Sequence, residues 1–536
     1  MRSIDSIPRL WGSEHSLLER FSNSCGVVRS CKVPLCANWR TAIAATKTQI
    51  KMVWKIWRWG FCWVGQAAFK RDSLMALPET SPTPQPSLHR TLGLWNLIII
   101  GMVIIQPTAP MGIYGVISNK AHGHVVTAIL IAMVAMLFTA ISYGRMARSY
   151  PSAGSAYTYV GQEMHSALGY VVGWGMVMDY LINPLICTAF CAQAAMNILP
   201  GLSFYAWIIF FAAFFTWTNL RGIKASARMN EALCAGMVVV VALFLAAVVR
   251  AVWGVQHDPG YFTHPFYEAA NFHASSIFAG TSVAVLTYIG FDAVSTFSEE
   301  VENPRRNIML ATVLVCLITG VLSGLEVYAA QLIWGSKEFK GDDVVSAFAI
   351  ISRQAGGAWL FQVVNFTLLI ANMGSGMGSQ LAAGRLLYGM GRGNALPKKF
   401  FGAIEPKRRI PRNNIIAVGG FALVGAGLLQ FFADKLGGGA YEIGAECLNF
   451  GAFVAFMGVN AAAFVHHLRS DKRGNIGAYI VPALGFLICG FIWVHLSHPA
   501  LVLGAVWMAA GIAYGAVRTR GFRSELVTFE VPADGA

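Results

Sequence analysis

Apolar stretches of about 20 residues recur along the chain from residue 91 onward, separated by short polar or basic breaks. A transmembrane helix needs roughly 20 mostly apolar residues, so each stretch can cross a bilayer. We predict twelve spans, at 92–117, 124–146, 167–197, 204–220, 231–254, 276–298, 308–334, 358–391, 414–432, 441–466, 477–496 and 499–517. The chain is 56% hydrophobic and 12% charged, whereas soluble domains are about 25% charged. The sequence therefore predicts an all-α polytopic membrane protein.

Lysine and arginine are concentrated in every second break between the predicted spans. The even-numbered breaks and the C-terminal segment carry 20 of them, and the odd-numbered breaks carry 6. Because basic loops stay on the cytoplasmic side, both termini are predicted to be cytoplasmic. The formal charge of +14 is then mainly a topology signal. It indicates basic loops anchored at the inner leaflet of the lipid bilayer and does not indicate nucleic-acid binding.

Residues 1–90 follow a different pattern. They mix Trp with Lys and Arg, as in KMVWKIWRWGFCWVG, and end in LPETSPTPQPS, whose composition is typical of a linker. This extension is a disordered segment, a basic amphipathic segment on the membrane, or sequence upstream of a true start at Met75, and we favour the first and third readings. The predicted organisation is an extension over 1–90, a twelve-helix domain over 91–520 and a cytoplasmic tail over 521–536.

Two prolines, Pro107 and Pro110, interrupt the first predicted span, IIIGMVIIQPTAPMGIYGVI. Proline has no N–H and clashes with the preceding turn, which frees backbone carbonyl groups. Inside lipid such a break is tolerated only where it is buried in protein or lines a cavity. The sequence therefore predicts a discontinuous first helix, with a simple proline kink as the alternative.

The sixth span carries a second irregularity, Gly290 near its centre with Asp292 beside it. A carboxylate at that depth costs several kcal/mol unless it is paired or hydrated. Interrupted helices at corresponding places in two halves point to the binding site of an inverted-repeat transporter. The two breaks lie five helices apart, which fits such a repeat.

Other polar residues fall within the predicted spans. Asp179 lies about 18 Å along the third span, near mid-membrane, and shares a wedge of roughly 80° with Asn183, Gln193 and Asn197. The tenth span adds Glu442, Glu446 and Asn449, and the seventh adds Glu326. We interpret Glu442 as a helix-end residue, and Asp179, Asp292 and Glu446 as functional candidates.

Three long motifs resemble those of the amino acid/polyamine/organocation (APC) superfamily of permeases. They are ISYGRMARSYPSAGSAYTYV at 141–160, YIGFDAVSTFSEEVENPRRNIMLATV at 288–313 and AAGRLLYGMGRGNALPKKF at 382–400. The early QPTAPMGIYG and the residues of the first two motifs are most similar to those of bacterial putrescine-importer-like permeases. The resemblance implies a LeuT-type fold of five-plus-five inverted repeats with broken helices 1 and 6, alternating access, proton coupling and a place in the bacterial cytoplasmic membrane.

The first-helix break departs from the pattern of amino acid carriers in this superfamily. Those carriers have a G-x-G break whose amides hold the substrate carboxylate. Here the break region consists of Gln106, Pro107, Thr108, Ala109, Pro110, Met111 and Gly112. Because prolines remove amides and free carbonyls, the site suits an ammonium group better than a carboxylate. Amides of Gly112 and Gly115 leave the carboxylate as the alternative.

The remaining site residues are carried over from the motifs. Tyr288 precedes Gly290 and Phe291, which match the unwound segment and aromatic gate of the family, so Phe291 can close over an amine by cation–π contact. Asp292, Asp179, Asn183 and Glu446 complete the candidate substrate site. Some bacterial relatives have a lysine in the fifth helix, but that position here aligns with Met237. A carboxylate such as Asp179, Asp292 or Glu446 is then expected to carry the proton.

An acidic tract follows the sixth span. Glu299 and Glu300, with Glu302, precede Arg305 and Arg306, and these charges are expected to form ion pairs at a gate or a helix end, with Arg145, Arg148 and Arg385 as further partners. Exposed loop charges are the alternative interpretation.

The sequence thus predicts a secondary active transporter that imports a small amine or amino acid with proton coupling, a putrescine-like diamine being favoured. A neutral or cationic amino acid symporter or exchanger in the same fold is the close alternative. A membrane enzyme is disfavoured, because the spans hold no metal-spaced His/Cys cluster and no G-x-S-x-G, and no cofactor or metal is expected. A channel or a non-transporting sensor is the alternative of a different class.

Overall fold

The computed structural model describes residues 90–198, 201–340, 343–436, 439–469 and 476–522. The predictions for residues 1–89 and for most of the C-terminal tail lie outside this part of the chain. The long helices are α3 (Leu94–Ile105), α4 (Ala109–Lys120), α5 (Val125–Ser149), α7 (Ser166–Ile198), α8 (Phe204–Leu220), α9 (Ile223–Val252), α10 (Ala274–Ala284), α12 (Pro304–Trp334), α13 (Asp343–Gly356), α14 (Ala358–Arg392), α16 (Arg412–Leu436), α17 (Gly439–Arg469), α18 (Gly477–Val494) and α19 (His498–Arg518). Short elements are α6 (Ser155–Glu163), η2 (Val285–Tyr288), α11 (Ala293–Thr296), η3 (Ser298–Glu300) and α15 (Lys398–Phe401). Within the described ranges the chain forms no strand, and its β-type pairing is one isolated bridge, Leu92–Val301.

Most of these helices are long and apolar enough to cross a membrane. The described residues contain ten such spans, or eleven when the bent pair α3–α4 counts as one. Helix α8, at 17 residues, is apolar but shorter. Large apolar side chains face outward from the bundle, among them Val424, Leu487 and Val506 at 64%, 64% and 61% exposure, which suits contact with acyl chains. The prediction of an all-helical, multi-pass membrane protein is confirmed.

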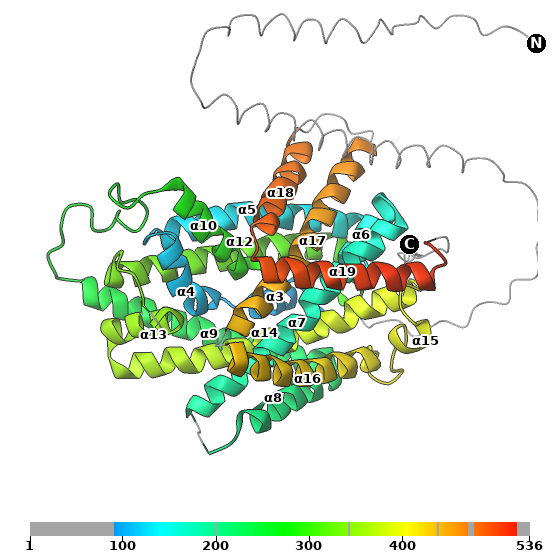
Figure 1. The fold of residues 1–536 in the computed structure, drawn as a ribbon, viewed down its shortest axis with the longest axis horizontal. Helices are drawn as coiled ribbons and strands as arrows, with labels where there is room; N and C mark the ends of the chain where they lie inside the picture. The colour runs from blue at the N-terminus through cyan, green and yellow to red at the C-terminus, as the bar shows by residue number, and fades with distance from the viewer. Residues whose placement is uncertain (1–89, 199–200, 341–342, 437–438, 470–475, 523–536) are drawn as a thin grey trace, which may run out of the picture. The chain divides into compact units, whose positions relative to one another are not determined.

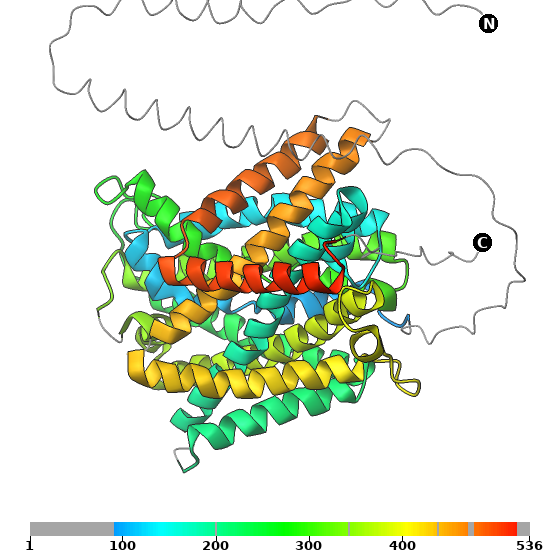
Figure 2. The ribbon, with the colours of Figure 1, turned by 45° about the vertical axis from the view of Figure 1, so that its right-hand side comes forward.

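Helix α7 is the hub of the packing. It contacts α14, α17, α16 and α8 along its length, and the short helix α6 packs against it. Helix α12 packs against α5 and α3. Helix α17 lies beside α18 and against α19, as both views of the ribbon show (Figures 1 and 2). Helices from distant parts of the sequence therefore surround α3 and α7.

The predicted break in the first span is present. Helix α3 ends at Ile105, helix α4 begins at Ala109, and their axes differ by 43°. Gln106, the first of the three residues between them, has a φ of 69°. Pro110 occupies the first turn of α4, where the missing N–H removes no helical hydrogen bond. The prolines therefore end one helix and begin another, and the interpretation as a simple kink is wrong.

The sixth span is interrupted as well. Helix α10 passes into the 3₁₀ turn η2, the chain then turns at Ile289–Asp292, and α11 restarts at Ala293. Gly290 has a φ of +121°, a conformation that residues with a Cβ rarely adopt. A Cβ at Gly290 would lie 3.0 Å from Ile104 Cγ2 and 3.3 Å from Ile105 Cγ1. The two breaks therefore pack directly against each other.

Replacing Gly290 with Ala is expected to lower the thermal stability of the purified protein in detergent. The backbone conformation strains a residue that has a Cβ, at a cost of about 1–3 kcal/mol, and the new methyl group meets Ile104. Gly420→Ala is the matched control, because the Cβ position at Gly420 is open to space within 4 Å. Equal melting temperatures for the two variants would contradict the close packing of the breaks.

Candidate functional site

The end of helix α3 offers backbone acceptors in the middle of the bundle. Pro107 has no N–H to give to the Val103 carbonyl four residues before it. The neighbouring Ile104 carbonyl accepts a hydrogen bond from the Ser375 hydroxyl at 2.7 Å. Thr108, fully buried in the break, has a hydroxyl without a partner among the described atoms. A side chain from another helix thus stabilises the break, and the Thr108 hydroxyl remains available for a further hydrogen bond.

Ser375 belongs to the small-residue run SGMGS of α14, which lies against α3. Cβ atoms at Gly374 and Gly378 would lie 2.5 and 2.4 Å from side-chain atoms of Val103 and Ile104. This close approach brings the Ser375 hydroxyl to the Ile104 carbonyl. Ser375 also lies 3.4 Å from Asn183 Oδ1 on α7, which accepts a second hydrogen bond from Cys187. Asn183 is therefore joined to the α3 break through Ser375.

Asp292, the last residue of the second break and the residue that precedes α11, is fully buried. The Tyr180 hydroxyl on α7 donates to Asp292 Oδ2 at 2.7 Å, while Oδ1 has no partner among the described residues. Asp179, next to Tyr180, is also buried, and its Oδ2 is likewise without a partner in the described structure. The two carboxyl groups are close enough to interact electrostatically. Buried carboxylate oxygens of this kind favour a cationic ligand or a proton.

Aromatic residues cover this region. The Phe291 ring stacks on Phe456 of α17 with centroids 5.1 Å apart and contacts Tyr143 of α5 edge-on at 5.7 Å. Tyr288 is buried and donates its hydroxyl to the Ile129 carbonyl at 2.9 Å. Phe291 thus lies beside the buried carboxylates between two helices, and Tyr288 anchors η2 to α5.

The other residues of the predicted site are placed around or away from the breaks. Pro107, Pro110 and Met111 are buried, Gln106 and Ala109 are half-buried, and Gly112 is exposed with no atom within 4 Å of its Cβ position. Glu446 is half-buried and accepts a hydrogen bond from Ser497, which precedes α19. Gln193 is exposed, and the side chains of Asn197 and Glu442 lie outside the described part of the structure. The structure therefore brings together Asn183 and the two breaks, and gives Glu446 a different partner.

The acidic tract after the sixth span forms buried ion pairs with α14. Glu300 accepts two hydrogen bonds from the Arg385 guanidinium, at 2.9 and 2.8 Å, and both side chains are buried. Glu299 pairs with Arg392 and accepts the Ala153 amide at 3.0 Å. Of the predicted arginine partners, Arg385 therefore pairs with the tract. These contacts tie the end of the sixth span to α14 and to the loop before α6.

The other predicted gating arginines lie on the last turns of α5 and the first turn of α12. Arg305, Arg306 and Arg148 line a cavity of about 820 Å³ where α5 ends and α12 begins, and Arg145 is half-buried on the last turns of α5. No ion pair between the acidic tract and Arg145 is present in the described coordinates.

Three residues that contribute to this region were not predicted from the sequence. Tyr180 follows Asp179 in the third span, Ser375 lies in a glycine-rich run, and Arg392 lies two turns beyond Arg385. The small-residue pattern in the eighth span signals close helix contact and could have indicated Ser375. The contact between Tyr180 and Asp292 joins residues 112 positions apart, and no local pattern encodes it.

Comparison with known proteins identifies the family. The family model "Amino acid permease" matches residues 97–528, which is most of the chain. The chain belongs to the amino acid permease family of the APC superfamily. It is therefore a membrane permease that transports amino acids or polyamines, and it is not an enzyme. The family assignment from the three sequence motifs is confirmed.

Relatives of the permease include transporters that are named for different substrates. It is 33% identical over 458 residues to the low-affinity putrescine importer PlaP of Escherichia coli K12, covering 84% of this chain and 98% of the relative. It is 23% identical to the branched-chain amino acid permease BcaP of Bacillus subtilis, over 83% and 96% of the two chains. It is 28% identical to the vacuolar cationic amino acid transporter 4 of Arabidopsis thaliana, over 74% and 65%.

Replacing Tyr180 of the permease with Phe is expected to lower its stability in detergent by about 1–3 kcal/mol, because Asp292 loses its hydroxyl donor in a buried environment. Tyr143→Phe is the control, since the Tyr143 hydroxyl has no partner among the described residues. Thermal unfolding of both variants measures the difference. An equal shift in melting temperature would show that the Tyr180–Asp292 hydrogen bond does not stabilise the break.

Proposed function

We propose that this permease imports a small amine, with a putrescine-like diamine favoured, by alternating access across the bacterial cytoplasmic membrane. The observation that carries the proposal is the pair of prolines at the α3–α4 break next to buried carboxyl oxygens. The prolines remove amide donors that would hold a carboxylate, and one oxygen of each carboxyl group, Asp292 Oδ1 and Asp179 Oδ2, lacks a donor among the described residues. Both features favour an ammonium group.

The proposed binding site is built from the two breaks and the adjoining face of α7. Gln106 to Gly112 would contribute backbone groups, Asp292 the anion, and Asp179 and Asn183 the facing polar side chains. Phe291, beside Asp292, would shield the ammonium by cation–π contact. Gly290 allows the close approach of the second break to Ile104. Tyr288 would position this turn, because its hydroxyl donates a hydrogen bond to the Ile129 carbonyl.

The proposed architecture is a twelve-helix LeuT-type domain over residues 91–520 with two inverted repeats. It is supported by the α3–α4 and α10–α11 breaks, and by α8 as a further apolar helix between α7 and α9. Both termini are proposed to be cytoplasmic. The Glu300–Arg385 and Glu299–Arg392 pairs would then lie on the cytoplasmic side, where they must separate for substrate release.

Proton coupling is part of the proposal. Met237, where some relatives have a lysine, is fully buried in α9 and carries no charge. A carboxyl group must then bind the proton, and Asp292 and Asp179 are better placed than Glu446, which is bonded to Ser497 next to α19. The direct test of this coupling is to measure substrate uptake into proteoliposomes before and after an inward proton gradient is dissipated.

An amino acid is the second candidate substrate. Relatives named as branched-chain and cationic amino acid transporters cover most of this chain. The Gly112 amide region is open in the structure, with nothing within 4 Å of the Cβ position. Amides after Pro110 could therefore receive a carboxylate at the N-terminus of α4.

Uptake of radiolabelled putrescine into proteoliposomes with an inward proton gradient is expected to be inhibited by unlabelled diamines and not by neutral amino acids. The reason is that the break region offers acceptors to an ammonium and few donors to a carboxylate. Empty liposomes provide the control. Competition by neutral amino acids, or uptake of an amino acid with no uptake of putrescine, would overturn the diamine assignment.

Replacing Asp292 with Asn is expected to reduce amine uptake strongly while the protein still inserts and purifies as a single species. Loss of a buried charge partner costs about 2–5 kcal/mol, or about 30-fold or more in apparent affinity. Asp258→Asn is the control, because Asp258 lies exposed in the loop between α9 and α10. Wild-type uptake by the Asp292→Asn variant would remove Asp292 from the binding site.

A further inference from the structure

Helix α12 carries a buried polar face that the proposed site does not use. Thr319, Ser323 and Glu326 are spaced by four and three residues, so they project from the same side of the helix. All three are fully buried. The two hydroxyl groups and both carboxylate oxygens of Glu326 have no hydrogen-bond partner in the described structure. A carboxylate with two unused oxygens in a membrane-embedded bundle points to a ligand.

This polar face lies along the broken first helix. The Leu92–Val301 bridge places the starts of α3 and α12 side by side, and the contact between Gly101 and Val315 further along both helices indicates that they run in the same direction. A Cβ at Gly101 would lie 2.7 Å from Val315 and from Val294 of α11. At 1.5 Å per residue, Thr319 is then level with the end of α3, and Glu326 lies about 10 Å further along α12, level with the first turns of α4.

The second break supplies a further hydroxyl at this level. The Tyr288 ring lies 3.2 Å from the Cβ position of Gly320, next to Thr319. Thr287, the neighbour of Tyr288 in η2, is fully buried, and its hydroxyl is without a partner among the described atoms. Polar side chains of η2 and of α12 therefore lie close together at the level of Gly320.

The hydrogen-bond acceptors on this face of α12 indicate the class of ligand. An alkylammonium has three N–H donors and no acceptor, and two carboxylate oxygens with neighbouring hydroxyl oxygens can accept all three. Hydroxyl groups rotate to present their lone pairs. A divalent or transition metal is a poorer match, because the described residues hold no cluster of three His, Cys, Asp or Glu side chains. The face suits a monovalent organic cation.

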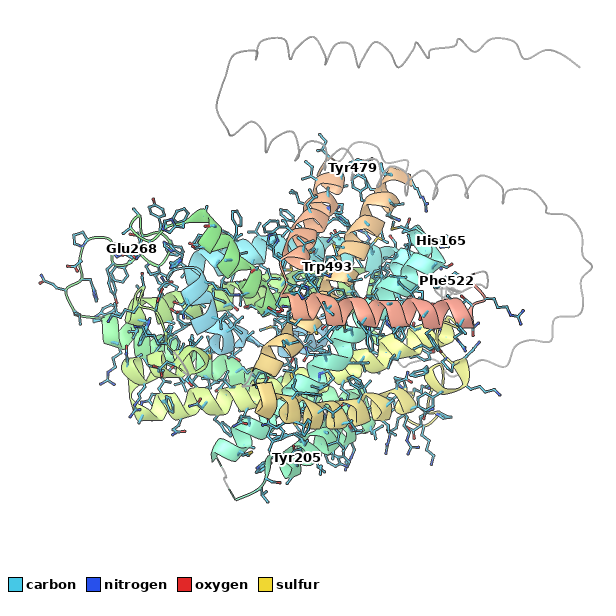
Figure 3. The ribbon with its side chains drawn as sticks, viewed as in Figure 1. His165, Tyr205, Glu268, Tyr479, Trp493 and Phe522 are labelled. Atoms are coloured by element: carbon cyan, nitrogen blue, oxygen red, sulfur yellow. The ribbon has the colours of Figure 1, made fainter. Side chains whose placement is uncertain are left out.

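A cavity lies beyond Glu326 at the same end of α12. It measures about 270 Å³ and is lined by Gln331, Glu268 and His264, among others. Glu268 lies in the loop between α9 and α10 (Figure 3). The hydrogen bond from Ser336, together with Asn271 and nearby histidines, lowers the pKa of the Glu268 carboxyl. Lys337 also lines this cavity, so an acidic and a basic side chain lie together beyond the end of α12.

We propose that the Thr319–Ser323–Glu326 face binds the second ammonium of a linear diamine whose first ammonium is held at Asp292. The inference rests on the proposed amine substrate and explains why a diamine would be selected over a monoamine. The two anions lie at different heights along α3 and α12, so the length of the carbon chain between the ammonium groups decides whether both are engaged. Glu326 is then a specificity-determining residue of the transport site.

The test measures inhibition of labelled putrescine uptake by unlabelled putrescine, cadaverine and butylamine in proteoliposomes. Wild-type protein is expected to bind both diamines more tightly than butylamine. Glu326→Gln is expected to weaken the diamines by about 30-fold or more and to leave butylamine unchanged, and Ser323→Ala is expected to have a smaller effect in the same direction. Glu338→Gln is the matched control, because Glu338 is exposed in the loop after α12.

Other outcomes overturn the inference in distinguishable ways. Equal losses for butylamine and the diamines in Glu326→Gln would show a structural role. An unchanged preference for diamines, with an altered response to sodium replacement or to loss of the proton gradient, would assign Glu326 to an inorganic cation or a proton. Absence of diamine uptake by the wild-type protein would overturn the proposed function and this inference together.

Discussion

The rest of the structure depends on satisfying backbone polar groups at two breaks inside an apolar bundle. The bilayer core contains no water that could bond to a freed carbonyl group. Each break must therefore be buried against protein. Here the breaks use each other and α14. Gly290 packs on Ile104 and Ile105, and Ser375 donates to the Ile104 carbonyl. Glycines at the α3–α14 contact permit the short distance that this hydrogen bond requires.

The same packing explains where the charges lie. Asp292 follows the second break directly and is buried with a single hydroxyl donor from Tyr180. Charged groups at such depth interact strongly because the surroundings have a low effective dielectric constant. At the other end of this segment, Glu300 and Arg385 satisfy each other through two hydrogen bonds. One acid is thus fully paired and the other keeps an unused oxygen, which separates a structural contact from a candidate ligand site.

Helix α12 connects these features. It begins beside α3 at the Leu92–Val301 bridge, packs on α3 and α11 at Val315, and carries Thr319, Ser323 and Glu326 past the breaks. A substrate held at Asp292 and Glu326 would contact both broken segments and α12 at once. Movement of α12 relative to the second break would change the distance between Asp292 and Glu326, and substrate binding would then be coupled to helix packing.

The helical membrane class, the approximate spans, the break at Pro107 and Pro110, the irregularity at Gly290 and the family could all be predicted from the sequence, because apolar length, proline chemistry and long motifs are local properties. Which polar residues meet could not be predicted and is known from the folded structure. It joined Tyr180 to Asp292 and Ser375 to Ile104, and it gave Glu446 a partner in Ser497. These pairs are far apart in the chain, and the rotation and height of each helix that bring them together depend on packing against several neighbours at once.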